Sequence, residues 1–145
     1  MDMNITASAD TFINVPAATV WKALTDAALV RQYFFNVDVE TDWQVGSPIT
    51  YRGEWEGKTF EEKGNVLKNV ENEVLESNYW SPSFGEDEPE NYVVVRYELA
   101  PDGDGTHLTI TQTGAKDQDS ADHSKANWQM VLDNMKKLLE TPAPI

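Results

Sequence analysis

From residue 36 to residue 114 the chain consists almost entirely of short segments in which apolar and polar residues alternate, and this pattern constrains the fold most. Turns such as Glu56-Gly57 and residues 101–105 separate the segments. Connections this short allow only antiparallel pairing, because parallel strands need crossovers of about a dozen residues or more. The pattern therefore predicts an antiparallel meander, with strands at residues 37–43, 49–55, 59–70, 74–80, 91–99 and 106–113.

Helical patterns flank this meander. Residues 7–15 alternate as a further strand, and Pro16 then begins a stretch up to residue 35 with apolar residues at helical spacing, which predicts two short helices. A long amphipathic helix is expected from Ser120 to Glu140. At about 1.5 Å per residue it is about 30 Å long, which matches a strand of about nine residues. We therefore expect a single α+β domain over residues 1–145, in which a curved antiparallel sheet packs against the C-terminal helix.

Charge and composition exclude several classes of function. Eleven Lys and Arg against 25 Asp and Glu give a net charge of -14, and such a surface repels phosphate backbones, so no nucleic-acid partner is expected. The longest apolar runs are far shorter than the ~20 residues that cross a bilayer. The acidic, polar N-terminus does not resemble a signal peptide. With no cysteine in the chain, these features predict a cytoplasmic protein without a membrane span.

No motif for catalysis or metal binding is found. The two histidines, His107 and His123, lack a partner pattern for acid–base or nucleophilic chemistry. Residues 102–106 resemble the start of a calcium loop, but His107 and Thr113 stand where that loop needs Gly and Glu, which favours a hairpin turn. We therefore expect no catalytic residue, no metal site and no cofactor.

Three glutamates on neighbouring strands, Glu54, Glu62 and Glu98, could approach one another as paired catalytic carboxylates. Arg52 and Arg96 lie on the outer faces assigned to Glu54 and Glu98 by strand alternation. Cross-strand ion pairs therefore explain these glutamates without catalysis.

The face of the sheet assigned to the C-terminal helix carries large aromatic side chains with polar groups, in addition to aliphatic ones. Such a face is either a filled core, in which tyrosine and tryptophan find partners, or the wall of a mainly apolar cavity with a few hydroxyls that orient a guest. Tyr51 and Tyr97 are expected to donate the orienting hydrogen bonds. The residues expected to line the cavity are Tyr51, Trp55, Phe60, Tyr79, Val95, Tyr97, Ile110, Trp128, Leu132 and Met135.

Short motifs along the chain match a known pattern. They are residues 15–26 (VPAATVWKALTD), residues 64–67 (GNVL), Tyr79-Trp80, residues 105–110 (GTHLTI) and Asn127-Trp128. Together they resemble the bacterial homologues of the heat-shock protein 90 ATPase activator, in the SRPBCC or START-like superfamily. The resemblance covers essentially the whole chain. It implies the helix-grip fold, as in the birch-pollen allergen: a curved antiparallel sheet around a long C-terminal helix, two short helices after the first strand, and a hydrophobic cavity between sheet and helix.

Three kinds of function follow from these observations. The leading prediction is a non-enzymatic module that binds a small apolar or amphipathic molecule, such as a lipid, in the cavity. The resemblance also implies a stress-related, co-chaperone-like module that binds a chaperone or another protein. A polyketide cyclase or hydrolase-type enzyme is the third alternative, and it would need an inward-pointing titratable group. On the inner face we expect only tyrosines to titrate, with His107 at its margin.

Overall fold

The computed structural model describes residues 5–34 and 37–140, apart from the side chains of Trp55 and Ser83. Its elements follow the predicted order of one strand, two short helices, six strands and one long helix. In chain order they are β1 (Thr6–Ile13), α1 (Ala17–Thr25), α2 (Ala27–Tyr33), β2 (Asp38–Glu40), β3 (Pro48–Trp55), β4 (Lys58–Val70), β5 (Val74–Tyr79), the 3-10 turns η1 (Pro82–Phe84) and η2 (Pro89–Asn91), β6 (Val93–Asp102), β7 (Gly105–Thr113) and α3 (Gln118–Glu140).

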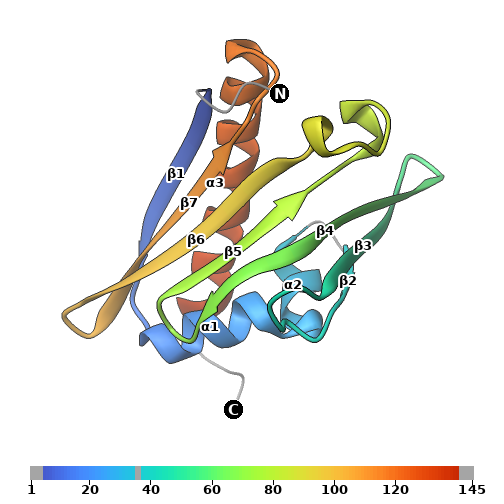
Figure 1. Cartoon of the computed structure of the whole chain (residues 1–145). Coiled ribbons are helices and arrows are strands. Elements are labelled where there is room, and N and C mark those ends of the chain that lie inside the picture. The colour runs from blue at the N-terminus through green and yellow to red at the C-terminus, as the bar shows by residue number, and fades with distance from the viewer. Residues whose placement is uncertain (1–4, 35–36, 141–145) are drawn as a thin grey trace.

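The seven strands form one antiparallel sheet in the order β1-β7-β6-β5-β4-β3-β2. Consecutive strands from β2 to β7 are neighbours, as expected for a meander, and β1 pairs with β7 over its full length from Thr6↔Thr113 to Ile13↔Thr106. Helix α3 lies across one face of this curved sheet (Figure 1). The predicted α+β arrangement is therefore confirmed.

The core lies between this inner face and α3. Val131, Leu132 and Met135 of α3 are fully buried, and so are Leu108 and Ile110 of β7. Alternation along the strands assigned these sheet residues to the inner face correctly, because successive side chains of a strand point to opposite faces. The tight aliphatic packing over β6 and β7 therefore anchors the helix.

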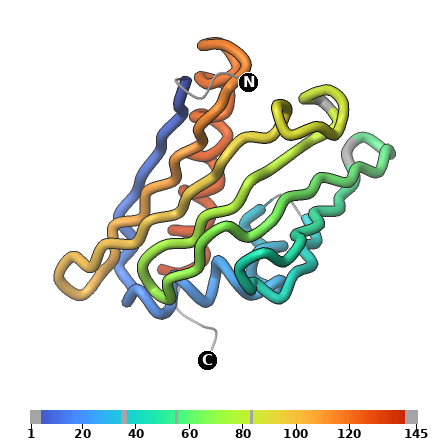
Figure 2. Tube along the Cα trace, viewed as in Figure 1, coloured from blue at the N-terminus to red at the C-terminus, as the bar shows by residue number. Residues whose placement is uncertain are grey.

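Helices α1 and α2 close one end of the space between the sheet and α3 (Figure 2). The Asp26 carboxylate accepts hydrogen bonds from the backbone N–H groups of Ala28 and Leu29, which ends α1 and caps α2. The Tyr33 hydroxyl donates to the carbonyl oxygen of Ala23 at 3.0 Å and ties the two helices together. At the other end of this space, at the start of α3, the part of the chain that the structure describes has no α-helix in a corresponding position.

Strand β4 bends the sheet. Its pairing with β5 shifts register between Val66 and Lys68, and beyond this irregularity β4 continues with β3 as a projecting hairpin (Figure 1). Gly64 allows the close approach at the bend, because a Cβ there would lie 2.0 Å from the carbonyl oxygen of Asn78.

None of the helices in the described part of the chain is long and apolar enough to cross a membrane.

Candidate functional site

Four tyrosines converge between the sheet and the helices, and we call Tyr33, Tyr51, Tyr79 and Tyr97 the tyrosine cluster. They come from α2, β3, β5 and β6, respectively. Burial is the main cause that raises the pKa of each one. Electrostatic repulsion from neighbouring tyrosines raises the pKa of Tyr33, Tyr79 and Tyr97 further, and the Glu62 carboxylate does so for Tyr51 and Tyr79. All four hydroxyls are therefore protonated at neutral pH and can donate hydrogen bonds.

The four hydroxyls differ in their partners. That of Tyr33 donates to the Ala23 carbonyl, that of Tyr51 is hydrogen-bonded to the Ser77 hydroxyl, and that of Tyr79 donates to the Glu62 carboxylate. No hydrogen bond joins the Tyr97 hydroxyl to another described residue, and burial with the neighbouring tyrosines raises its pKa. Every fully enclosed side-chain nitrogen or oxygen of the described residues has a partner. The Tyr97 hydroxyl is therefore not fully enclosed.

Edge-to-face ring contacts extend the cluster in two directions. The Tyr79 ring contacts Tyr51 at 5.7 Å and Phe84 of η1 at 5.8 Å between centroids. The Trp128 ring of α3 contacts Tyr97 at 6.1 Å and Phe34 at 5.8 Å. These aromatic pairs fix the orientation of the rings.

A polar network orients Trp128. Its indole Nε1 donates to Gln112 Oε1 at 2.8 Å, and Gln112 Nε2 donates to Ser124 Oγ at 3.3 Å. Gln112 is buried on β7, and its amide is satisfied by α3 on both sides. The network holds the indole ring against Tyr97 and links this part of the site to the first turns of α3.

Glu62 lies on the inner face, beside the tyrosine cluster. It stands opposite Tyr51 in the β3–β4 register, it is half-buried, and its carboxylate accepts the Tyr79 hydrogen bond. The expectation that Glu62 could approach Glu54 and Glu98 is therefore wrong, since alternation in β4 turns Glu62 inward and Glu61 outward, while Glu54 and Glu98 are exposed on the outer face. The expectation that only tyrosines titrate on the inner face is wrong for the same reason.

The outer face holds the ion pairs. Arg52 of β3 makes cross-strand ion pairs, but with Glu40 at 2.7 Å and Glu61 at 3.2 Å and not with a strand that carries Glu54 or Glu98. Arg96 of β6 pairs across the strands with Glu76 at 3.1 Å, and its 2.9 Å pair with Glu98 runs along the same strand. These contacts are cross-strand or along one strand and are exposed or partly exposed, so their role is structural.

His107 also belongs to the outer face and not to the margin of the inner face. Its Nε2 lies 2.6 Å from the Asp10 carboxylate of β1, and both side chains are exposed. His107 therefore has no access to the space between the sheet and α3.

The ten residues predicted to line a cavity fall into two groups. Those over β6, β7 and the middle of α3 are enclosed in the core, namely Val95, Ile110, Leu132 and Met135. Those nearer to the β3–β5 side are half-buried and keep accessible surface, namely Tyr51, Phe60, Tyr79, Tyr97 and Trp128. The side chain of Trp55 lies outside the described residues. Contact with a ligand remains a prediction for all ten.

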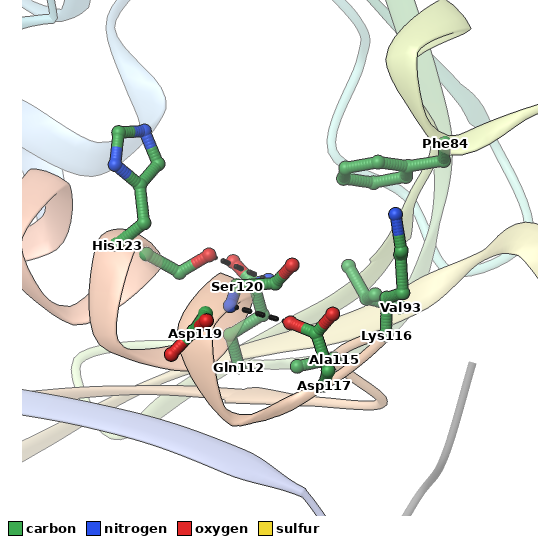
Figure 3. A pocket seen from close by; sticks show the side chains of 10 residues that line it. Phe84, Val93, Gln112, Ala115, Lys116, Asp117, Asp119, Ser120 and His123 are labelled. Carbon is green, nitrogen blue, oxygen red and sulfur yellow. Dashed lines mark hydrogen bonds between the residues drawn. The ribbon is translucent and has the colours of Figure 1, made fainter.

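A pocket of about 400 Å³ opens where α3 begins. Figure 3 shows Phe84 on one side and residues of the first turns of α3, such as Asp119 and His123, on the other. Phe84 also contacts the Tyr79 ring, and Gln112 also binds Trp128, so the pocket adjoins the aromatic residues of the site. Its full lining is Phe84, Val93, Gln112, Ala115, Lys116, Asp117, Asp119, Ser120, His123 and Ser124.

Acidic side chains at this pocket do not assemble a metal site. Asp117 accepts a hydrogen bond from the backbone N–H of Ser120 at 2.8 Å, which caps the start of α3. In the described part of the chain, no three His, Cys, Asp or Glu side chains come together in a metal-binding arrangement.

Sequence reasoning missed several residues of the site. Tyr33 ends a helix that was assigned no role, and Phe34 follows it directly. Phe84 lies in an irregular loop for which no pattern predicts a direction. Glu62 could have been found, because it has the same parity along β4 as Phe60, which was placed on the inner face.

The seven-stranded antiparallel sheet, the two short helices after β1 and the C-terminal α3 define a helix-grip α+β protein. Residues 14–140 match the family model described as "Activator of Hsp90 ATPase homolog 1-like protein", and the chain belongs to this family. A comparison with curated proteins gave no match.

Solved structures show the same fold. The solution structure of a Cytophaga hutchinsonii protein is 37% identical, covers 97% of each chain and superposes with a TM-score of 0.82. A crystal structure from Mesorhizobium loti is 23% identical over 96% of this chain and 99% of its own, with a TM-score of 0.78. The solution structure of the Aha1 dimer from Colwellia psychrerythraea is 19% identical over 94% and 96%, with a TM-score of 0.74. At such low identity the last two support the fold alone.

Proposed function

We propose that the protein is a non-enzymatic binding module that holds a small apolar or amphipathic molecule between the sheet and α3. The ligand would contact the half-buried aromatic residues of the predicted set, above all Tyr51, Tyr79, Tyr97 and Trp128. The pocket at the start of α3 would provide the route of entry, because its residues Phe84 and Gln112 contact that aromatic surface directly. Mainly apolar walls with a few well-placed hydroxyls are typical of small-molecule sites.

The Tyr97 hydroxyl carries this proposal. It lies among protein atoms that raise its pKa by burial, yet none of the described residues accepts its proton. Because this hydroxyl is not fully enclosed, it is free to donate to a ligand. An acceptor group of the ligand would take this hydrogen bond, worth about 0.5–1.5 kcal/mol, while its apolar part would cover the ring of Trp128, 6.1 Å from that of Tyr97.

The packing of the interior is consistent with such a site. Side chains over β6 and β7 are enclosed, whereas Tyr51, Tyr79 and Tyr97 keep accessible surface although burial dominates their pKa values. If the space between the sheet and the helix is not completely filled, side chains this deep in the protein keep accessible surface.

Titration with N-phenyl-1-naphthylamine, an uncharged dye whose fluorescence rises in apolar surroundings, tests the proposal. We expect saturable binding at one site and displacement of the dye by 1-octanol. Tyr97→Phe should weaken 1-octanol about fivefold, the effect of one hydrogen bond of about 1 kcal/mol, and should leave the affinity for the dye unchanged. The matched control is Tyr92→Phe, since the Tyr92 hydroxyl bonds Asp87 on the exposed surface.

Failure of the wild-type protein to bind the dye saturably would contradict the proposal. Equal effects of the two tyrosine variants on 1-octanol would remove Tyr97 from the site.

The family description favours a second candidate, a module that binds a chaperone or another protein. With a net charge of -14, such a module would bind a basic surface, and its affinity would fall steeply between low and high salt. Binding of an uncharged molecule in an apolar site would respond little to salt. Pull-downs at two salt concentrations therefore separate the two functions.

A further inference from the structure

We propose that the ligand of this site is an amphipathic amine, whose protonated amino group is bound by Glu62 between the rings of Tyr51 and Tyr79. This inference rests on the proposed binding function and adds the chemical class of the ligand. From Glu62 the ligand would extend toward Trp128 and pass the Tyr97 hydroxyl, which would donate to an acceptor group of the ligand.

Among the described residues, the carboxylate of Glu62 has no cationic partner. None of their ion pairs includes Glu62, although Arg52, Lys63 and Arg96 on the opposite face of the sheet are all paired. Its one hydrogen bond in the described part of the chain comes from the Tyr79 hydroxyl. A carboxylate has about four acceptor positions, so Glu62 keeps acceptor capacity for a ligand.

Aromatic rings surround this carboxylate. Tyr51 stands opposite Glu62 across the β3–β4 pair, and the Tyr79 ring lies 5.7 Å from that of Tyr51. Phe60, two residues away on the same face of β4, covers Gly53, where a Cβ would lie 2.4 Å from its ring. A carboxylate with several aromatic faces is suited to an ammonium group, which gains both a charge-assisted hydrogen bond and cation–π attraction.

The position of Glu62 also explains why an amine fits better than a neutral alcohol or an acid. Half-burial weakens the hydration of the carboxylate, so a hydrogen bond from a cation is worth about 1.5–3 kcal/mol, more than one from a neutral donor. A ligand acid would place a second negative charge beside Glu62 in a protein that already carries a net charge of -14.

Three compounds with the same alkyl chain test the inference by displacement of N-phenyl-1-naphthylamine at pH 7. We expect octylamine to bind about tenfold more tightly than 1-octanol, and octanoate to bind most weakly. Glu62→Gln should remove the preference for octylamine and leave the affinity for 1-octanol within about twofold. Glu54→Gln is the matched control, because it removes the same charge from the exposed outer face of the same hairpin.

The outcomes separate this inference from the proposed function. If the three compounds displace the dye equally well, the binding function stands and the inference is wrong. If Glu62→Gln and Glu54→Gln weaken octylamine equally, the preference comes from the overall charge and the inference is also wrong. If neither the dye nor any of the three compounds binds saturably, the binding function itself fails.

Discussion

Removal of the Tyr97 hydroxyl should leave the protein as stable as before or more stable, whereas removal of the Tyr33 hydroxyl should destabilise it. Both residues belong to the tyrosine cluster, so Tyr→Phe removes the same single oxygen from each, with Tyr33 buried and Tyr97 half-buried. The two differ in their hydrogen bonds: Tyr33 donates to the Ala23 carbonyl at 3.0 Å, and the Tyr97 hydroxyl has no partner among the described residues.

The magnitudes follow from this difference. A buried hydrogen bond contributes about 0.5–1.5 kcal/mol, and an acceptor left without its donor adds to the loss, so Tyr33→Phe should lower the free energy of unfolding by about 1–2 kcal/mol. Tyr97→Phe replaces an unsatisfied hydroxyl by an apolar edge and should change the free energy of unfolding by about 0 to +1 kcal/mol. The two variants therefore differ in sign or differ by at least about 1 kcal/mol.

Urea denaturation followed by tryptophan fluorescence measures both values. With a slope of about 1–3 kcal/mol per molar urea, Tyr33→Phe should lower the midpoint by roughly 0.5–1 M, and Tyr97→Phe should leave it unchanged or raise it. If Tyr97→Phe lowers the midpoint as much as Tyr33→Phe does, its hydroxyl stabilises the fold through a protein partner, and the main support for the binding site is lost.

Two further predictions concern the rest of the fold. Met135→Ala removes a fully buried side chain of α3 and should lower the free energy of unfolding by about 2–5 kcal/mol. Met130→Ala, at a position of the same helix that is 52% exposed, should change it by less than about 0.5 kcal/mol. The urea midpoints of the two variants check this prediction. Asp117→Ala removes the cap on the Ser120 N–H. The bonds to Ser120 hold the pKa of Asp117 below its usual value, so their contribution is present above the unfolded pKa of about 4 and is lost as pH falls through the lower folded pKa. The melting temperature of the variant should lie below that of the wild type at pH 7, and the gap should close toward pH 3; a gap that is constant with pH would contradict the capping role.

The sequence predicted the fold well because local patterns decide it. Alternation in β3, β6 and β7 fixed both the strands and their inner faces, and the i, i+3, i+4 repeat of α3 left its apolar stripe a single place to pack. Short turns such as Glu56-Gly57 then allowed only antiparallel neighbours. These are properties of single segments or of adjacent ones, and one sequence contains them.

The site was predicted less completely because it depends on contacts between distant segments. Glu62 was grouped with Glu54, on the other strand of the hairpin, as a carboxylate that could approach it. In an antiparallel pair, residues directly opposite each other share a face, so the register Tyr51↔Glu62 and Gly53↔Phe60 turns Glu62 inward. Only the lengths of the two strands and the turn between them set this register. A shift by one residue would turn Glu62 to the outer face.

The interior of the protein is divided between two tasks, and this division lets it carry polar groups without loss of the fold. Aliphatic side chains over β6, β7 and α3, such as Ile110, Leu132 and Met135, are enclosed and supply most of the burial that stabilises the domain. The Glu62 carboxylate and the hydroxyls of Tyr51 and Tyr79 belong to β4, β3 and β5, at the opposite side of the inner face from β1. A substitution there, such as Glu62→Gln, changes polarity at the rim of the core and not at its centre. Binding and stability should therefore depend on different residues. Glu62→Gln should change the affinity for an amine, and Met135→Ala should change the free energy of unfolding, so a comparison of the two variants tests this separation.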